Sequence, residues 1–219
     1  MSDGGYHAGS DLGRARRVVV EICRTMHARG LLAGRDGNVS VRIGSHRLLI
    51  TPSGARKGYL RPEDCVLCDL MGRPETSPGH GKPSSEVGMH LAVYEARPDV
   101  RAVVHAHPPA AVAHTVAGVP LEPLMPEVYC ELGDVKTLDY TTPGTPEVGQ
   151  AVGEAILGRT ALLMSRHGSI TVGETLTQAY DRLEILEHAA RISLMARTLS
   201  PNGTFPLSPA ALAALTPAG

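Results

Sequence analysis

The chain has 219 residues, 42% of them hydrophobic and 20% charged, with a formal net charge of −1 at pH 7. This length and composition suit a globular domain with a buried core, and the near-neutral charge argues against binding to nucleic acid or to an anionic membrane surface. No stretch reaches about 18 apolar residues and residues 1–10 contain no apolar run, so we expect neither a membrane span nor a signal peptide.

The first half of the chain predicts a helix, three short strands and a second helix. Apolar side chains recur at helical spacing from Val19 to Met26, and Gly30 follows as a stop signal. Alternating apolar runs bounded by turn-forming residues indicate the strands, and Ser85 is expected to cap the second helix. The predicted helices cover 11–29 and 85–96, and the predicted strands cover 39–43, 47–51 and 65–70.

The second half of the chain predicts two more strands and three more helices. Pro108 and Pro109 suit the first turn of a short helix, and Gly158 closes a later one. A long helix with apolar residues along one side completes the core. The predicted strands cover 100–105 and 160–164, and the predicted helices cover 108–118, 145–157 and 175–199.

These elements predict a single domain over residues 11–199. The strands between 39 and 70 follow one another without crossover helices, which favours an α+β or three-layer arrangement with antiparallel pairs over a doubly wound parallel sheet. On either side of this domain we expect a flexible N-terminus at 1–10 and a loosely ordered, Pro/Ala-rich tail at 200–219.

The four cysteines do not form a disulfide framework in a chain of this size. Cys65 and Cys68 are spaced as C-x-x-C, but they fall in an alternating run in which residues three apart point to opposite strand faces. No second C-x-x-C is present to complete a zinc knuckle. We therefore interpret Cys23, Cys65, Cys68 and Cys130 as structural thiols and expect a reducing, cytoplasmic setting.

His105 and His107 give the strongest local signal for chemistry. They lie two residues apart at the end of an apolar strand, so both imidazoles project from the same face. Zinc and related metals bind convergent nitrogen or carboxylate ligands at about 2.0–2.2 Å. Taken alone, however, such a pair is more often a set of surface or capping histidines.

His167 strengthens the metal hypothesis. It follows the apolar run 161–164, and Gly168 is expected to permit a sharp turn that leaves the imidazole exposed at the strand end. Three histidines at strand ends, with an open fourth position, are the pattern of a catalytic metal site. His90, one turn after Glu86, could share a metal with that carboxylate, but packing explains it as well.

The segment 82–86 (KPSSE) predicts an anion-binding helix start. Unpaired N–H groups and the helix dipole near Ser84 and Ser85 attract anions, and Glu86 could ligate metal or act as a general base. Plain helix capping would also explain these residues. The small polar loops at 34–40 and 51–54 can present backbone N–H groups to a phosphate.

Schiff-base chemistry is not expected, because it needs a buried, desolvated lysine. The only lysines are Lys57, Lys82 and Lys136, and all three lie in polar or turn-rich stretches.

Five motifs in this order resemble the class II aldolase and adducin family, and within it the branch of L-fuculose-phosphate aldolase. They are GNVS (37–40), TPSG (51–54), KPSSE (82–86), HAHP (105–108) and RHG (166–168), and the match spans roughly residues 11–199. The resemblance implies a three-layer α/β/α fold with a mixed, mostly antiparallel central sheet. It also implies a homotetramer with active sites at the subunit interfaces.

The resemblance further assigns roles to individual residues. It implies a zinc ion, with manganese or cobalt as alternatives, on His105, His107 and His167. Glu86 would ligate the resting metal and act as acid/base once substrate displaces it. The substrate phosphate would be held by Asn38, Ser53, Gly54, Ser84 and Ser85.

The implied reaction is cleavage of a ketose 1-phosphate to dihydroxyacetone phosphate and an aldehyde, through an enediolate whose charge the metal stabilises as a Lewis acid. L-Fuculose 1-phosphate and a 5-deoxy- or 5-substituted pentulose 1-phosphate are equally compatible substrates. Glu86 and H-A-H favour an aldolase, because the related epimerases carry Asp and H-T-H there.

Two positions depart from the fuculose-phosphate enzyme. Its proton-donating tyrosine corresponds to a position near Met125–Pro126, with Tyr129 only an approximate substitute, and its C-terminal tyrosine has no counterpart in the tail. A 4-epimerase, or a decarboxylase or dehydratase of the same family, would keep the same metal set. A non-catalytic, adducin-like scaffold is the alternative from another class, but a scaffold need not keep three histidines and the acid.

Overall fold

The computed structural model describes residues 12–75, 81–200, 202 and 206–215. The flexible N-terminus expected at 1–10 lies outside these residues. The helices are α1 (Leu12–Ala28), α2 (Val87–Ala96), α3 (Pro109–Ala117), α4 (Pro126–Leu132), α5 (Pro146–Ala155), α6 (Leu176–Leu199) and α7 (Pro209–Leu215). The strands are β1 (Asn38–Ile43), β2 (Arg47–Ile50), β3 (Val66–Asp69), β4 (Ala102–Ala106), β5 (Lys136–Leu138), β6 (Ala161–Met164) and β7 (Gly168–Gly173).

The strands form one mixed sheet in the order β3-β2-β1-β4-β7-β6-β5. Every neighbouring pair is antiparallel except β5 and β6, which are parallel. This confirms the mostly antiparallel sheet and the absence of a doubly wound arrangement. A hairpin turn joins β1 to β2 and a longer connection, residues 51–65, leads to β3, whereas β4 inserts between β1 and β7 in the middle of the sheet.

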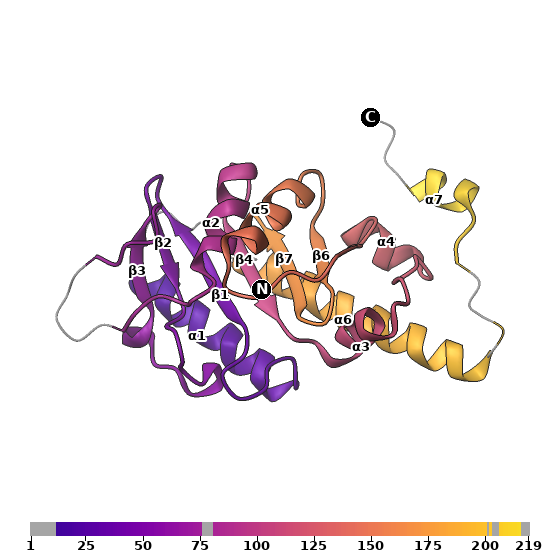
Figure 1. Cartoon of the computed structure of the whole chain (residues 1–219), viewed down its shortest axis with the longest axis horizontal. Helices are drawn as coiled ribbons and strands as arrows, with labels where there is room; N and C mark the ends of the chain where they lie inside the picture. Colours follow the sequence, from indigo (N-terminus) through magenta and orange to yellow (C-terminus); the bar gives the residue numbers. More distant parts are fainter. Residues whose placement is uncertain (1–11, 76–80, 201, 203–205, 216–219) are drawn as a thin grey trace, which may run out of the picture.

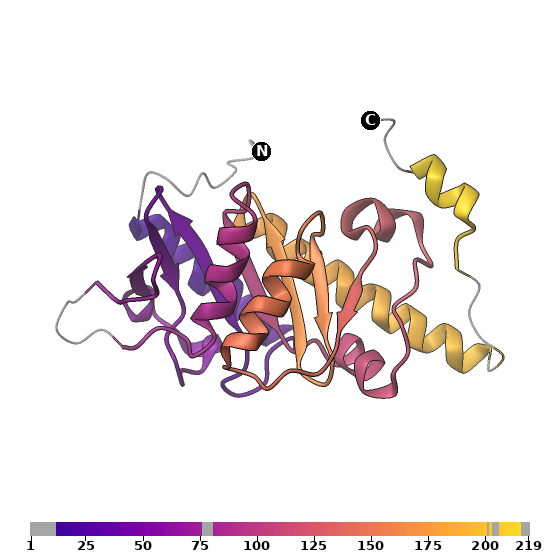
Figure 2. The same cartoon turned by 45° about the horizontal axis from the view of Figure 1, so that its top comes forward.

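Helices cover both faces of the sheet, which gives the expected three layers (Figures 1 and 2). On one face, α1 and α6 pack against side chains such as Val39, Val41 and Val104. On the other face, α2 and α5 pack against Leu48, Val103 and Leu162. The alternation of neighbouring residues between the two cores follows from the two-residue period of a strand.

A third, smaller core lies at the far end of the sheet. There α3 and α4 pack with α6 over Ala161 and Leu163 of β6. The tail that we expected to be loosely ordered contains α7, and the backbone N–H of Leu207 donates to the carbonyl of Pro123 just before α4 (3.0 Å). Among the described residues, none of the helices combines the length and apolar character that a membrane span would need.

The cysteines are free thiols, as predicted. Cys65 packs in the core under α1, and Cys68 packs in the core under α2, so the C-x-x-C pair points to opposite sheet faces. Burial raises the pKa of Cys65 to about 12, which leaves its thiol protonated and unreactive. Cys130 differs from the expectation of a small core residue because it is exposed.

Two glycines in the loop before β1, Gly34 and Gly37, differ in how much space surrounds them, so substituting each with alanine separates backbone strain from crowding. Gly34 (φ +58°) and Gly37 (φ +67°) both have left-handed backbones, but only a Cβ at Gly37 would crowd its surroundings, 2.7 Å from the carbonyl oxygen of His105. We expect Gly34→Ala to cost about 1 kcal/mol through strain alone. Gly37→Ala should cost about 2–5 kcal/mol, because overpacking adds to that strain. Urea unfolding of both variants would test this, and equal losses would contradict it.

Candidate metal centre and substrate pocket

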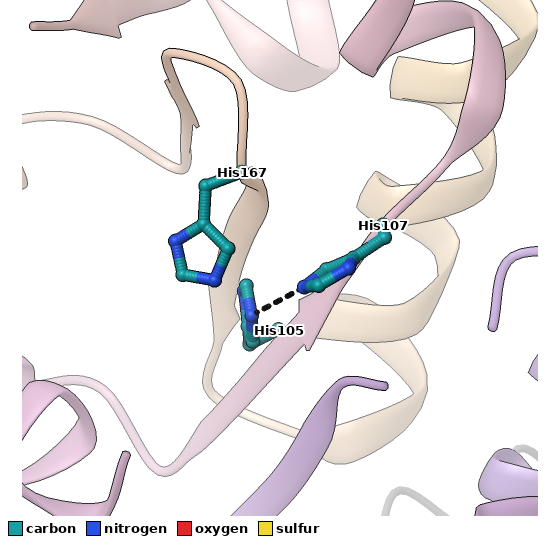
Figure 3. A group of neighbouring side chains, drawn as sticks. All are labelled: His105, His107 and His167. Carbon is teal, nitrogen blue, oxygen red and sulfur yellow. Dashed lines mark hydrogen bonds between the residues drawn. The ribbon is translucent and has the colours of Figure 1, made fainter. Parts of the chain in front are cut away.

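Three histidines converge because β4 and β7 are neighbours in the sheet. His105 lies on β4 opposite Ile170 of β7, and His107 follows two residues later. His167 lies in the turn that joins β6 to β7, so the same pairing brings it beside them. The three rings have centroids 4.8–5.1 Å apart, and one ligand atom from each can be chosen within 4.8 Å of the others. Figure 3 shows the rings turned toward a common centre.

Glu86 completes the cluster from the helical layer, at the start of α2. It is the N-cap residue of α2, with φ −99° and ψ 17°, and its side chain makes no capping bond. The carboxylate instead faces the histidines, with Oε1 3.2 Å from His167 Nε2 and Oε2 3.4 Å from His105 Nε2. This corrects the prediction that Ser85 is the cap of the helix. Because the Glu86 carboxylate makes no capping bond to the helix, it can contact the histidines.

The spacing of these donor atoms fits one small divalent cation. Two ligands of a tetrahedral zinc are about 3.3 Å apart when each bond is about 2.0–2.1 Å. The distance between the Nε2 atoms of His105 and His107 is 3.1 Å, and both imidazole–Glu86 distances are close to this value. Oε1 of Glu86 is buried and has no hydrogen-bond partner among the described residues. A cation bound here would give that oxygen a partner.

The hydrogen bonds of His105 and His107 leave their Nε2 lone pairs facing each other, an arrangement that a cation between them would stabilise. Nδ1 of His105 donates to the carbonyl of Ser169 (2.8 Å), which leaves a lone pair on Nε2. Nδ1 of His107 faces the carboxylate of Asp36 at 3.5 Å, which favours a proton on that nitrogen too. The two Nε2 lone pairs would then repel each other unless a cation lies between them. Outer carboxylates and carbonyls hold metal-binding histidines in this way.

Charge at the site is set by burial and by these neighbours. Burial lowers the pKa of His105 to about 3, so its imidazole is neutral at pH 7. Burial alone would raise the pKa of Glu86, but the imidazoles of His167 and His105 and the amide of Asn38 hold it well below its usual range. A neutral His105 beside an ionised Glu86 is the pair of protonation states that metal binding requires.

The turn that carries His167 differs from the prediction in its details. The left-handed residue is Arg166 (φ 58°), not Gly168. Gly168 is needed for space instead, because a Cβ there would contact the backbone oxygen of Ala106 and approach the ring of His107 to 2.8 Å. The His167 side chain is also largely buried, with 8% exposure, whereas we expected it to be exposed.

All five residues predicted to hold a phosphate lie together. Two backbone hydrogen bonds join the loop at 51–54 to the segment 82–86. Ser53 N–H donates to Lys82 O (2.9 Å), and Ser84 N–H donates to Thr51 O (3.1 Å). A cavity of about 290 Å³ opens beside them and also reaches Glu86, His107 and His167. Its lining includes the whole predicted set, which is Asn38, Ser53, Gly54, Ser84 and Ser85.

Lys57 was missed by the sequence analysis, which placed it in a polar stretch. It is 4% exposed, and its Nζ donates to the carbonyls of Arg35 (2.8 Å) and Ala55 (3.0 Å). It thereby ties the loop before β1 to the loop after β2, and it also lines the cavity. Burial lowers its pKa. The only hint in the sequence is its position three residues after Gly54, just beyond the loop at 51–54 already suspected of binding anions.

Comparisons with known proteins agree with this site. The family model described as Class II Aldolase and Adducin N-terminal domain matches residues 17–194. The chain belongs to the class II aldolase and adducin family. The L-fuculose phosphate aldolase of Methanococcus maripaludis is 33% identical over 82% of this chain and 96% of its own length. These findings confirm the family that the motifs indicated, and they make the chain a class II aldolase.

Other relatives carry different substrate names. A 5-methylthioribulose-1-phosphate/5-deoxyribulose-1-phosphate aldolase of Rhodospirillum rubrum is 39% identical over 75% of this chain and 73% of its own length. A 3-oxo-tetronate 4-phosphate decarboxylase of Haemophilus influenzae is 31% identical over 81% of this chain and 85% of its own. The crystal structure of YgbL from Klebsiella pneumoniae superimposes with a TM-score of 0.87 at 29% identity, covering 95% of this chain and 100% of that one.

Removing one histidine should abolish tight metal binding. We expect the wild-type chain to bind about one zinc ion, and His105→Ala to weaken binding by more than about 100-fold, because even the outer partners of ligands are worth 10–100-fold. Competition with a chromogenic chelator would measure both affinities. His46→Ala is the control, because His46 is exposed in the turn between β1 and β2. Equal affinities for wild type and His105→Ala would contradict the assigned centre.

The buried histidines also predict acid sensitivity of the protein without metal. Burial lowers the pKa of His90 to about 4 and that of His105 to about 3, from an ordinary value of 6.5. The unfolded chain therefore binds more protons as the pH falls below 6.5. The free energy of unfolding should decrease from pH 6.5 toward pH 4, by on the order of 3 kcal/mol for His90 alone. Urea unfolding at several pH values would measure it, and a flat profile would refute the buried neutral state.

Proposed function

We propose that this class II aldolase is zinc-dependent and cleaves a ketose 1-phosphate to dihydroxyacetone phosphate and an aldehyde. The observation that carries the proposal is the single cavity in which Glu86, His107 and His167 adjoin all five predicted phosphate-binding residues. A phosphorylated sugar can therefore place its anionic end and its reacting carbons in one pocket. The aldolase names of the Methanococcus and Rhodospirillum relatives support the same chemistry.

The bond changes define what the residues must do. Cleavage breaks the C3–C4 bond, the C4 hydroxyl loses a proton as the aldehyde forms, and C3 gains a proton to complete dihydroxyacetone phosphate. When bound, the metal supplies a Lewis acid for the negative charge that develops on the carbonyl oxygen. His105, His107 and His167 would hold that metal, with zinc preferred by the nitrogen-rich set and manganese or cobalt as substitutes.

Glu86 is the group beside the reacting carbons that we assign to proton transfer at C3. The residues around it keep the carboxylate ionised, and the carboxylate is not used to cap the helix. General acid–base catalysis requires such a group within hydrogen-bond reach of the reacting atom. Ser53, Gly54, Ser84, Ser85 and Asn38 would anchor the phosphate, which fixes the orientation of the chain that is cleaved.

The proton acceptor for the C4 hydroxyl is not among these residues. Tyr129, the approximate substitute for the family tyrosine, lies on α4 and is not among the described residues that line the cavity. We propose a homotetramer with active sites at the subunit interfaces, so that a side chain from a neighbouring subunit completes each site. We propose the cytoplasm as its setting.

Decarboxylation is the second candidate reaction. The Haemophilus relative is a 3-oxo-tetronate 4-phosphate decarboxylase, and loss of CO₂ from a 3-oxo acid would also create negative charge on an oxygen that a metal can stabilise. We rank it below aldol cleavage because the Methanococcus and Rhodospirillum aldolases are more similar to this chain, at 33% and 39% identity, than the decarboxylase, at 31%.

A substrate panel would decide between these reactions. Zinc-loaded protein should release dihydroxyacetone phosphate from L-fuculose 1-phosphate, 5-deoxyribulose 1-phosphate or 5-methylthioribulose 1-phosphate. Coupling to a glycerol-3-phosphate dehydrogenase and following NADH would detect the product. The panel should include L-ribulose 5-phosphate and a 3-oxo-tetronate 4-phosphate. Epimerisation alone, or CO₂ release alone, would overturn the proposal.

Glu86→Gln is the control within this assay. It keeps the size of the side chain but cannot carry a proton, so kcat should fall at least about 100-fold, the lower end expected for general acid–base catalysis. Zinc content should be retained through the three histidines. A Glu86→Gln variant with unchanged kcat would remove Glu86 from the mechanism.

A further inference from the structure

A row of buried polar side chains runs from Glu86 into the core between α2 and β1. Glu86, His90 and Tyr94 lie four residues apart along one side of α2, and Asn38 and Ser40 lie two residues apart on the facing side of β1. Four residues of helix rise about 6.0 Å and two residues of strand about 6.6 Å, so the two sets interleave. His90 and Ser40 are completely buried, and Asn38 and Tyr94 are at most 3% exposed.

Hydrogen bonds connect every neighbouring pair in this row. Asn38 Nδ2 donates to Glu86 Oε2 at 2.7 Å, and Asn38 Oδ1 lies 2.5 Å from His90 Nε2. The other ring nitrogen of His90, Nδ1, lies 2.6 Å from Ser40 Oγ, which is 2.9 Å from the Tyr94 hydroxyl. No member of the row is therefore left without a partner, although the row lies between two apolar layers.

The carboxylate fixes the direction of all these bonds. An ionised carboxylate only accepts hydrogen bonds, so the NH₂ group of Asn38 must face Glu86 and its carbonyl oxygen must face His90. That oxygen requires a proton on His90 Nε2. A neutral His90 then has no proton on Nδ1, which must accept from the Ser40 hydroxyl. Ser40 in turn accepts from Tyr94, so one tautomer and one amide orientation satisfy the whole row.

If the hydrogen bonds of the row ran in the opposite direction, the bond between Asn38 and Glu86 would be lost. If His90 carried its proton on Nδ1, its Nε2 lone pair would face the carbonyl oxygen of Asn38. The amide would then have to turn its carbonyl toward the Glu86 carboxylate, and two acceptors would face each other at 2.7 Å. Buried polar groups without partners cost about 1–3 kcal/mol each. The position of one proton on His90 therefore decides whether Glu86 is held or repelled.

We propose that His90 is a positioning residue for Glu86: with its proton on Nε2, it locks the amide of Asn38 so that Nδ2 holds the carboxylate beside the three histidines. This inference rests on the proposed role of Glu86 in proton transfer. His90 touches no reacting atom and acts only through Asn38. Nδ2 of Asn38 has a second hydrogen, so the same amide can also donate to a ligand in the cavity that it lines.

The first experiment tests the tautomer without any substrate. Protein labelled with ¹⁵N-histidine and stripped of metal should show a proton on Nε2 of His90, whereas His105, which donates from Nδ1 to Ser169, should show the opposite tautomer. Ser40→Ala removes the donor to Nδ1 but leaves the Asn38 carbonyl facing Nε2, so the same tautomer should persist. A proton on Nδ1 of His90 in the wild type would overturn the proposal.

The second experiment uses variants matched in size. His90→Gln places an N–H donor near the original Nε2, whereas His90→Leu has similar bulk and no donor. We expect kcat of His90→Leu to fall by about 10–100-fold, as for other outer partners of catalytic groups, with KM changed little. His90→Gln should restore most of that loss. Tyr94→Phe is the control, because Ser40 keeps its hydroxyl proton for His90 when the Tyr94 hydroxyl is absent.

A cobalt-loaded protein provides a readout that is independent of turnover. The visible spectrum of bound Co²⁺ reports its ligands, so His90→Leu should alter it, whereas His90→Gln and Tyr94→Phe should match the wild type. Identical spectra and kcat values for wild type and His90→Leu would overturn the proposal. If no ketose 1-phosphate is cleaved, the proposed function fails, and the tautomer and cobalt spectra still decide the role of His90. If His90→Leu does not fold, the tautomer of His90 in the wild type gives the decision.

Discussion

The pairing of β4 with β7 is the interaction on which the rest of the site depends. Through it, the two histidines at the end of β4 meet the turn that carries His167, and His105 gains its partner at the carbonyl of Ser169. The same close approach explains why Gly168 has no side chain, and the pairing of β1 with β4 brings Gly37 onto the backbone of His105. A metal centre built on two central strands inherits the rigidity of the sheet, which is what a precise ligand set requires.

The helical layer brings a carboxylate to this rigid edge of the sheet. Glu86 stands at the start of α2, and the polar residues behind it replace apolar contacts that the surrounding core would otherwise supply. Such a row is stable only because each of its members is hydrogen-bonded. The loops at 34–38 and 53–57, joined through Lys57, then enclose the open side of the site and form the rest of the cavity. Fold stability and site geometry thus depend on the same buried polar contacts.

Sequence patterns predicted the longer elements well and the short ones poorly. Helices α1 and α6 have many turns of regular apolar spacing, and their predicted bounds agree with the structure within one residue. Strand β5 has three residues and α4 has seven, too few for a period to be recognised. Strand β7 was missed although Ser169, Ile170, Thr171 and Val172 alternate in polarity, because Gly168 was interpreted as part of a turn. The parallel pairing of β5 with β6 depends on a long connection and could not be inferred from local pattern.

By itself, the sequence determined the residue types of the site and their family, because ligand identity is written in short ordered motifs around His105, His107, His167 and Glu86. It also determined that the thiols are free and that the sheet is largely antiparallel. Only the tertiary structure decided that Glu86 is a cap residue facing the histidines, that Lys57 is buried, and that Asn38 meets His90. These features depend on contacts between residues about 20 to 80 positions apart in the chain. Local periodicity carries no information about such contacts, since they are set by how the helical layer docks on the sheet.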